Sequence, residues 1–207
     1  MDQVIQFVNS YVSEQLTTLI VSILPLIELK GSILFARASG MDFFTSLLYS
    51  YLGSTFVFFP IFFLLVPILN LLKKIKWFNK LALKIESYFS NKAKEVSEKR
   101  QGKGLSESGM KILGVFLFVA IPLPMTGVWT GTAIAVFLGL KFKQAVLPVA
   151  IGNLIAGLII SLLAELFYDY IDYILYGLLA FVLIGIVVLV VKLSLSKPKS
   201  EEGEKQE

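Results

Sequence analysis

A charged tripeptide, Glu28-Leu29-Lys30, interrupts an otherwise apolar part of the chain. The mostly apolar residues 16–27 precede it, and a ten-residue stretch that ends at Gly40 follows it. Because a spanning helix needs about 20 residues, two such short arms are typical of a hairpin that enters the bilayer and returns. Ionisable groups at that depth persist mainly where they face protein or a water-filled cavity. The pattern therefore predicts a polar site within a membrane.

A carboxylate at the tip of such a hairpin could bind a proton and a cationic substrate in turn, and Glu28 is the candidate for this role. The alternative is an ion pair with Lys30 or Arg37 that only fixes the hairpin. Lys30 and Arg37 are two helical turns apart and could together hold an anionic headgroup. Arg37 could instead extend its charge to the membrane interface. Gly31 is expected to permit the sharp reversal at the tip.

A second apolar segment ends in the uncharged run Pro122-Leu-Pro-Met-Thr-Gly-Val-Trp-Thr-Gly131. Its prolines break the helix and its glycines permit close backbone approach. Carbonyls and hydroxyls freed in this way could coordinate a cation or substrate, because exposed backbone at this depth must be buried in protein or line a cavity. Trp129 could stack on a cationic ligand or simply pack. The candidate pathway residues here are Pro124, Thr126, Gly127, Trp129, Thr130 and, on the next helix, Asn153.

The helix-breaking residues around the two tips coincide when the chain is shifted by 99 residues. Each repeat would be a re-entrant hairpin followed by one spanning helix. Since a hairpin returns to its own side, the second repeat must be inverted relative to the first. Inverted repeats with broken helices around a central site are a recurring transporter design. The coinciding pairs include Pro25 and Pro124, Gly40 and Gly139, and Gly53 and Gly152.

These patterns predict an all-α integral membrane protein with two inverted repeats of a re-entrant hairpin plus a transmembrane helix, and an extra C-terminal transmembrane helix. The 207 residues, 56% hydrophobic and 16% charged, leave no room for a large soluble catalytic domain. The expected parts of this one membrane domain are an interfacial amphipathic helix (1–15), a first hairpin plus transmembrane helix (16–72), a basic loop (73–111), a second hairpin plus transmembrane helix (112–168), a last transmembrane helix (173–191) and a disordered tail (192–207).

The loop 73–111 carries eleven basic and four acidic residues. The positive-inside rule places this loop in the cytoplasm of an inner-membrane protein, together with the C-terminus, and places Asp169 and Asp172 outside. The apolar run 43–72 is long for one span, so Pro60 and Pro67 are expected to kink it or end the span early.

Several classes of function are excluded or disfavoured by composition. The chain has no Cys and no His, which removes thiolate nucleophiles, imidazole bases and the usual zinc or haem ligands. It shows no local carboxylate cluster and no phosphate-binding loop with Gly-Lys-Ser/Thr. We therefore expect no enzyme activity, no cofactor and no bound metal. The net charge is +4, and the basic residues cluster beside hydrophobic segments. The expected partner is therefore a membrane surface rather than nucleic acid.

The two tips resemble the signatures of the small multi-drug export protein family. Pro25-Leu-Ile-Glu-Leu-Lys-Gly-Ser-Ile matches its first signature, and the run from Pro122 to Gly131 matches its second, more specific one. The resemblance covers about residues 24–157 and implies a small bacterial or archaeal inner-membrane protein. The departures are Lys30, Leu34 and Met125, where Arg, Pro and Gly are usual.

The paired hairpins are also similar to the DedA/VTT membrane proteins, which include undecaprenyl-phosphate flippases and scramblases. That group tends to hold phosphate with arginines around its second hairpin. Here no Arg or Lys lies between Lys111 and Lys141, which disfavours a phospholipid substrate.

The expected function is a secondary membrane transporter that moves a small or amphipathic solute coupled to protons or cations. One alternative is a lipid or polyprenyl-phosphate flippase or scramblase of DedA type, with Lys30 and Arg37 at the headgroup. Another is a non-transporting membrane scaffold. The expected partners are the lipid bilayer and a small-molecule or lipid substrate. A homodimer would surround hairpins that cross only half of the bilayer.

Overall fold

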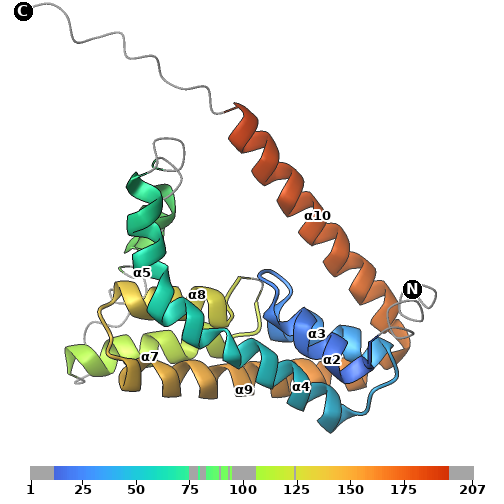
Figure 1. Ribbon diagram of the computed structural model, residues 1–207. Coiled ribbons are helices and arrows are strands. Elements are labelled where there is room, and N and C mark those ends of the chain that lie inside the picture. Colours follow the sequence, from blue (N-terminus) through green and yellow to red (C-terminus); the bar gives the residue numbers. More distant parts are fainter. Residues whose placement is uncertain are drawn as a thin grey trace, which may run out of the picture.

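The computed structural model describes residues 12–74, 79, 83–88, 90–92, 94, 106–123 and 125–195, and every regular element in these ranges is helical (Figure 1). Most of the predicted segments 1–15, 73–111 and 192–207 lies outside these residues, as does Pro124.

Two pairs of short helices contain the predicted tips. The first pair is α2 (Glu14–Ile23) and α3 (Glu28–Ala38), and the second is α7 (Glu107–Ala120) and α8 (Val128–Phe137). These helices have 10 to 14 residues, which corresponds to about 15–21 Å. Since the hydrocarbon core is about 30 Å thick, none of the four is long enough to span it alone.

The other described helices include α4 (Phe43–Phe56), α5 (Phe58–Lys74), α9 (Phe142–Leu166), the short 3-10 helix η1 (Tyr168–Tyr170) and α10 (Ile171–Leu195). Three helical stretches of the described residues are long and apolar enough to cross a membrane, namely Phe43–Lys74, Phe142–Leu166 and Tyr168–Gly185. The prediction of an all-helical membrane protein with several transmembrane helices is therefore confirmed.

The first long stretch is broken at Val57, between α4 and α5, and Figure 1 shows α5 turning away from α4. Proline lacks an amide hydrogen and its ring clashes with the carbonyl four residues earlier. For Pro60 that carbonyl belongs to Phe56, the last residue of α4, so the position of the break agrees with the clash that Pro60 would cause. Pro67 lies inside α5 and does not end it.

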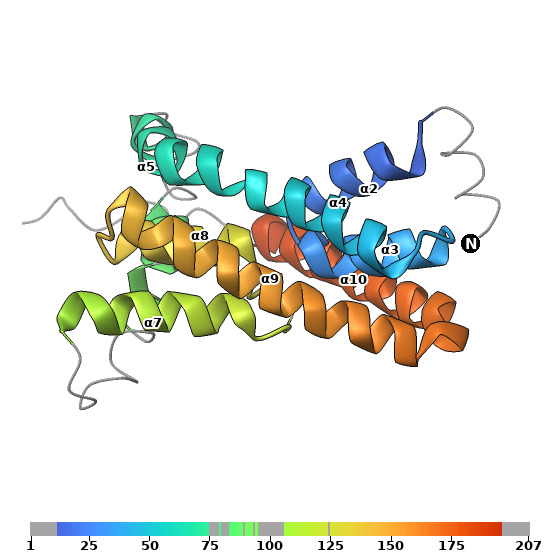
Figure 2. The same cartoon turned by 90° about the horizontal axis from the view of Figure 1, so that it is seen from below.

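The centre of the molecule is formed by α4 and α9, which run in opposite directions (Figure 2). In this arrangement α2 and α3 pack against α4, while α7 and α8 pack against α9. The short helices also reach across, because α3 contacts α9 and α8 contacts α5. The two tips consequently meet near the middle of the long helices.

The interior of α2, α3 and α4 is lined by buried hydroxyl groups. Ser32 Oγ donates to the Thr18 carbonyl at 2.8 Å and lies 2.9 Å from Ser50 Oγ. Interhelical hydrogen bonds of this kind stabilise membrane helices by about 0.6–2 kcal/mol each. Aliphatic and aromatic contacts instead hold α7, α8 and α9 to α5, including Phe58, whose ring centroid lies 5.7 Å from that of Phe142.

The ends of α3 and α8 share one terminal motif. Gly40 has φ 90° and its amide donates to the Arg37 carbonyl, as Gly139 has φ 71° and donates to the Val136 carbonyl. In each case the following amide reaches the carbonyl five residues earlier. This is the Schellman pattern, which favours glycine because the left-handed region is costly for other residues.

Gly40→Ala and Gly139→Ala are each expected to lower the free energy of unfolding by about 1 kcal/mol, the cost of a β-carbon in the left-handed region. A β-carbon at either position has nothing within 4 Å, so backbone strain is the only cost. Thermal unfolding of the purified protein in detergent measures this. The control is Gly177→Ala, which is helical with equally open space and should be at least as stable as wild type. Unfolding temperatures of Gly40→Ala and Gly139→Ala equal to that of Gly177→Ala would contradict the prediction.

Candidate functional site

Glu28 begins α3 in a left-handed backbone conformation, with φ 48°, and Leu26 just before it has φ 76°. Such conformations cost about 1–3 kcal/mol for residues other than glycine and persist where the surroundings enforce them. The reversal between α2 and α3 is therefore made by Leu26 and Glu28. The expectation that Gly31 makes it is wrong, because Gly31 lies inside α3 without a positive φ.

The carboxylate of Glu28 is buried, with 6% of the residue exposed, and it contacts the start of α8. One oxygen, Oε1, accepts a hydrogen bond from the Trp129 amide at 3.2 Å. A β-carbon on Gly127 would overlap the same carboxylate. Since Gly127 has no side chain to cap α8, Glu28 provides that cap from the other tip. A helix N-terminus attracts a negative charge, so the start of α8 attracts this carboxylate.

Lys30 binds the second tip directly. Its Nζ donates to the Leu123 carbonyl and, at 3.1 Å, to Thr126 Oγ1. The Leu123 carbonyl belongs to the irregular segment between α7 and α8, where the helix has ended and its backbone oxygens need other partners. Lys30 therefore satisfies backbone and hydroxyl oxygens. Among the described residues no ion pair joins Glu28 to Lys30 or Arg37.

Trp129 connects the tips in the reverse direction. Its indole Nε1 donates to the carbonyl of Ile23, the last residue of α2, at 3.0 Å. Its backbone amide is the group that binds Glu28. Sequence reasoning considered the Trp129 ring only as a stacking surface, and no local signal indicated that both of its N–H groups would contact the first tip.

Asn153 lies away from the tips, between α9 and α4. It is 2% exposed, and its Nδ2 donates to Ser54 Oγ at 2.8 Å and to Thr55 Oγ1 at 3.0 Å. Thr130 is buried in the first turn of α8. The structure thus brings Glu28, Lys30, Thr126, Gly127 and Trp129 together at the tips, and it places Asn153 deeper between the long helices.

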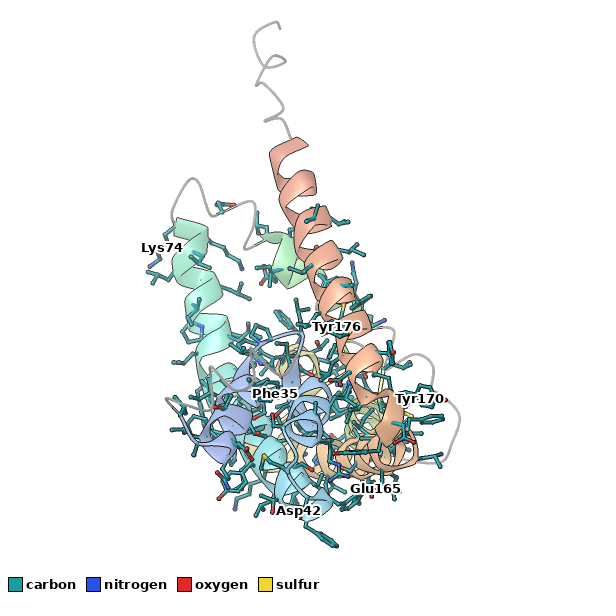
Figure 3. The ribbon with its side chains drawn as sticks, turned by 90° about the vertical axis from the view of Figure 1, so that its right-hand side faces the viewer. Phe35, Asp42, Lys74, Glu165, Tyr170 and Tyr176 are labelled. Carbon is teal, nitrogen blue, oxygen red and sulfur yellow. The ribbon has the colours of Figure 1, made fainter. Side chains whose placement is uncertain are left out.

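Arg37 lies at the other end of α3, apart from Glu28 and Lys30. The residue is only 8% exposed; Nη1 donates to the Met41 carbonyl at 2.7 Å and Nη2 pairs with Glu165. The guanidinium also lies 5.1 Å from the ring centroid of Tyr168. Figure 3 looks onto this end of the molecule, with Glu165 near the end of α9 and Tyr170 at the base of α10. Arg37 therefore joins α3 to α9 and η1.

Glu165→Gln is expected to lower the free energy of unfolding by about 1–2 kcal/mol, because it removes the charged partner of a buried guanidinium. The loss is smaller than the 3–5 kcal/mol typical of a fully buried pair, since 57% of the Glu165 side chain is exposed. Thermal unfolding in detergent measures it. Asp169→Asn, an exposed acidic residue nearby, is the control and should leave the midpoint unchanged. Equal midpoints for both variants would show that the pair contributes nothing.

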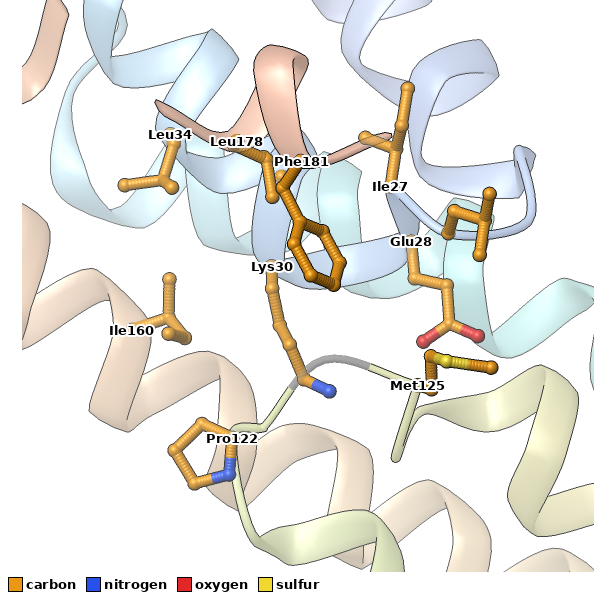
Figure 4. Close-up of a pocket in the computed structure, with 11 residues that line it drawn as sticks. Ile27, Glu28, Lys30, Leu34, Pro122, Met125, Ile160, Leu178 and Phe181 are labelled. Atoms are coloured by element: carbon orange, nitrogen blue, oxygen red, sulfur yellow. The ribbon is translucent and has the colours of Figure 1, made fainter. Parts of the chain in front are cut away.

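A cavity of about 160 Å³ lies between the tips, α9 and α10 (Figure 4). Of the described residues that line it, Glu28 is the only acidic one and Lys30 the only basic one. The other walls are mostly apolar: Leu26, Ile27, Gly31, Leu34, Pro122, Met125, Ile160, Leu178 and Phe181. In the described part of the chain no three acidic, His or Cys side chains gather to hold a metal ion. The cavity offers two ionisable groups in an apolar surrounding.

Sequence reasoning missed the contribution of α10 to this cavity. Leu178 and Phe181 are ordinary residues of an apolar helix, and nothing in their spacing distinguishes them. The signal that could have found them is Gly31. A β-carbon there would lie 2.9 Å from Leu178 Cδ2 and 2.6 Å from Ile27 Cγ2, so Gly31 is the place where α10 approaches α3 closely.

The helices and the two polar tips define a multi-pass helical membrane protein. A family model described as "Putative small multi-drug export protein" matches residues 28–159, more than half of the chain. The chain belongs to this family, whose description is that of an export protein rather than an enzyme. Searches of curated proteins and of solved structures each find no match. The matched range begins at Glu28 and contains the second tip, whereas Leu26, α2 and α10 lie outside it.

Proposed function

We propose that the chain is a secondary membrane transporter that moves a small or amphipathic solute coupled to protons or cations, with Glu28 as the group that binds them. The observation that carries this proposal is the position of the Glu28 carboxylate. It lines the cavity and at the same time caps α8 through the Trp129 amide. A proton or cation on this carboxylate weakens its attraction to the positive end of α8. Ion binding is thereby linked to the contact between the tips.

The architecture we propose is that of two inverted repeats, each a re-entrant hairpin followed by a long helix. Matching local features recur 99 residues apart. Left-handed backbone occurs at Leu26 and again at Met125. In both repeats the second short helix ends with the same glycine motif. The long helices α4 and α9 begin at equivalent residues, Phe43 and Phe142.

Contacts between equivalent residues also support this architecture. The Glu28 carboxylate packs against Gly127, and Ser54 is hydrogen-bonded by Asn153; both pairs are separated by 99 residues. Residues that touch their own equivalents lie beside a two-fold axis, as in symmetric dimers. The exchanged contacts of α3 with α9 and of α8 with α5 follow the same symmetry. Because α4 and α9 run in opposite directions, such an axis would lie in the membrane plane and make the repeats inverted.

A small solute is favoured over a lipid phosphate by the partners of the two cations. Lys30 is engaged by Leu123 and Thr126, and Arg37 by Met41 and Glu165. The two residues also lie about 10 Å apart along α3, at 1.5 Å per residue. They therefore form no joint phosphate site of the kind that a flippase of DedA type would need.

The experiment that tests the function uses the full chain in proteoliposomes that enclose a pH-sensitive dye. A pH gradient is imposed, and organic cations, organic anions and neutral sugars are added outside one at a time. Proton movement that depends on both the protein and a solute is expected. A fluorescent-lipid scrambling assay on the same vesicles tests the flippase alternative. If no solute drives the movement of protons, or of Na⁺ in a parallel assay with an imposed sodium gradient, the transporter proposal is removed and a scaffold or flippase remains.

The proposed topology places the loop 73–111 and the C-terminus in the cytoplasm and Asp169 outside, because basic loops are retained inside. The chain contains no Cys, so single-cysteine variants can be labelled without background. Lys103→Cys and Asp169→Cys are expected to react with an impermeant maleimide from opposite sides of inner-membrane vesicles. Labelling of both from the same side would rule out this topology.

A further inference from the structure

We infer that the cavity between the tips selects small monovalent organic cations, with Glu28 binding the charge and α10 limiting the size of the apolar body. The inference rests on the proposed function, because it names the substrate class of that same site. It adds a selectivity that neither the family description nor the coupling role of Glu28 supplies.

The preference for a cation follows from a comparison of Glu28 and Lys30, because only Glu28 can still accept a further partner. Glu28 uses Oε1 for the Trp129 amide, while Oε2 packs against Gly127 and accepts no hydrogen bond from the described residues. A carboxylate can accept several hydrogen bonds or pair with a cation. Lys30 is already engaged by two oxygen atoms of the second tip. An incoming anion would compete with those oxygens for Lys30 and would be repelled by Glu28. A cation could instead pair with the Glu28 carboxylate.

The preference for a monovalent ligand follows from the number of charged groups in the cavity. The charged group beside Glu28 is Lys30, on the same helix, and the described lining residues of α9, α10 and the second tip are uncharged. One carboxylate can be neutralised by one proton or by one monovalent cation, so their exchange leaves the net charge unchanged. A divalent cation would leave an extra positive charge next to Lys30 in a medium where like charges repel strongly.

The size limit follows from the volume and walls of the cavity. An apolar cavity of about 150 Å³ holds one benzene molecule, and this cavity is similar at about 160 Å³. Leu178 and Phe181 of α10 close one wall, as Figure 4 shows. The close approach at Gly31 holds Leu178 against α3. Because α10 lies outside the family-matched residues, the size limit is set by an element separate from Glu28 and from the second tip.

The test uses tetraalkylammonium ions, which keep their charge at every pH, cross lipid poorly and differ only in size. In proteoliposomes of the full chain with an imposed pH gradient, tetramethylammonium and tetraethylammonium are expected to exchange for protons. Tetrabutylammonium is expected to exchange at least tenfold more slowly. The neutral analogue tert-butanol and the anion tert-butylsulfonate, which stays charged and does not carry protons across lipid, should not inhibit tetramethylammonium exchange at the same concentration. Inhibition by tert-butylsulfonate equal to that by tetraethylammonium would overturn the charge assignment.

The size assignment is tested with two neighbouring leucines of α10. Leu178→Ala enlarges the cavity and is expected to raise tetrabutylammonium exchange about tenfold relative to tetramethylammonium. Leu179→Ala is the matched control, because Leu179 does not line the cavity and is 43% exposed. An unchanged size order in Leu178→Ala would overturn the role of α10.

Binding separates this inference from the proposed function. Tetramethylammonium binding to the detergent-purified full chain is followed by tryptophan fluorescence, since Trp129 contacts Glu28. Binding without exchange would support the cation site and refute transport. Exchange of anionic or neutral solutes without tetramethylammonium binding would refute the cation site and leave transport standing. If neither binding nor exchange is observed, both the cation site and the transport function are refuted.

Discussion

Glu28→Gln is expected to reduce pH-driven solute exchange in proteoliposomes by at least about tenfold while the protein still folds. Glutamine has nearly the same shape, and its side-chain oxygen can still accept the Trp129 amide hydrogen bond. It carries no charge and binds no proton, so the coupling step is removed. A neutral acceptor in this hydrogen bond contributes about 0.5–1.5 kcal/mol and a charged one about 1.5–3 kcal/mol. The difference of about 1–1.5 kcal/mol corresponds to about a factor of ten.

Two further variants show whether the loss belongs to the carboxylate itself. Glu28→Asp keeps the charge one methylene further from α8, so we expect partial exchange that retains its pH dependence. Asp169→Asn removes an exposed carboxylate far from the tips and should behave as wild type. Gel filtration and thermal unfolding in detergent establish that each variant is folded. Full pH-dependent exchange by Glu28→Gln would remove Glu28 from the coupling mechanism.

Gly127→Ala is expected to abolish exchange and to lower the free energy of unfolding by about 1–3 kcal/mol, the usual cost of overpacking. The added β-carbon would overlap the Glu28 carboxylate, so the two tips can no longer meet as they do here. Gly127 has φ −96°, which alanine adopts without strain, so the cost reports the overlap and not the backbone. Thermal unfolding and proteoliposome exchange measure the two effects.

A double-mutant cycle identifies Glu28 as the obstructed group. If the overlap causes the loss, Gly127→Ala should cost much less stability in a Glu28→Ala background, where the carboxylate is gone. Gly177→Ala, with open space around its β-carbon, is the control for a glycine replacement in this fold. Equal costs of Gly127→Ala in both backgrounds would show that the tips do not meet through Glu28.

Local patterns in the sequence were sufficient for the helices and the positions of the two tips. Apolar runs long enough to span predict the transmembrane helices, because every backbone hydrogen bond of a helix is made within one short segment. The break at Phe56–Val57 follows from Pro60, whose ring clashes with the carbonyl four residues earlier. The tip motifs likewise carried the family resemblance, which the family model confirms over residues 28–159.

Only the tertiary structure decided which groups the charged side chains of α3 contact. Glu28 contacts the amide of Trp129, Lys30 contacts the carbonyl of Leu123, and Arg37 pairs with Glu165, each across roughly a hundred residues or more. The sequence left the pairing of Glu28 with Lys30 or Arg37 open, since all three lie on one segment.

The role of α10 shows the same limit most clearly. In a membrane, apolar side chains gain little by preferring protein over lipid, so hydropathy does not tell a cavity wall from a lipid-facing surface. Leu178 lines the cavity and Leu179 does not, although the two are identical in type and adjacent. The sequence by itself determined that Glu28-Leu29-Lys30 is a polar tip within apolar helices. The packing of distant helices decided that Glu28 caps α8 and that α10 closes the cavity beside it.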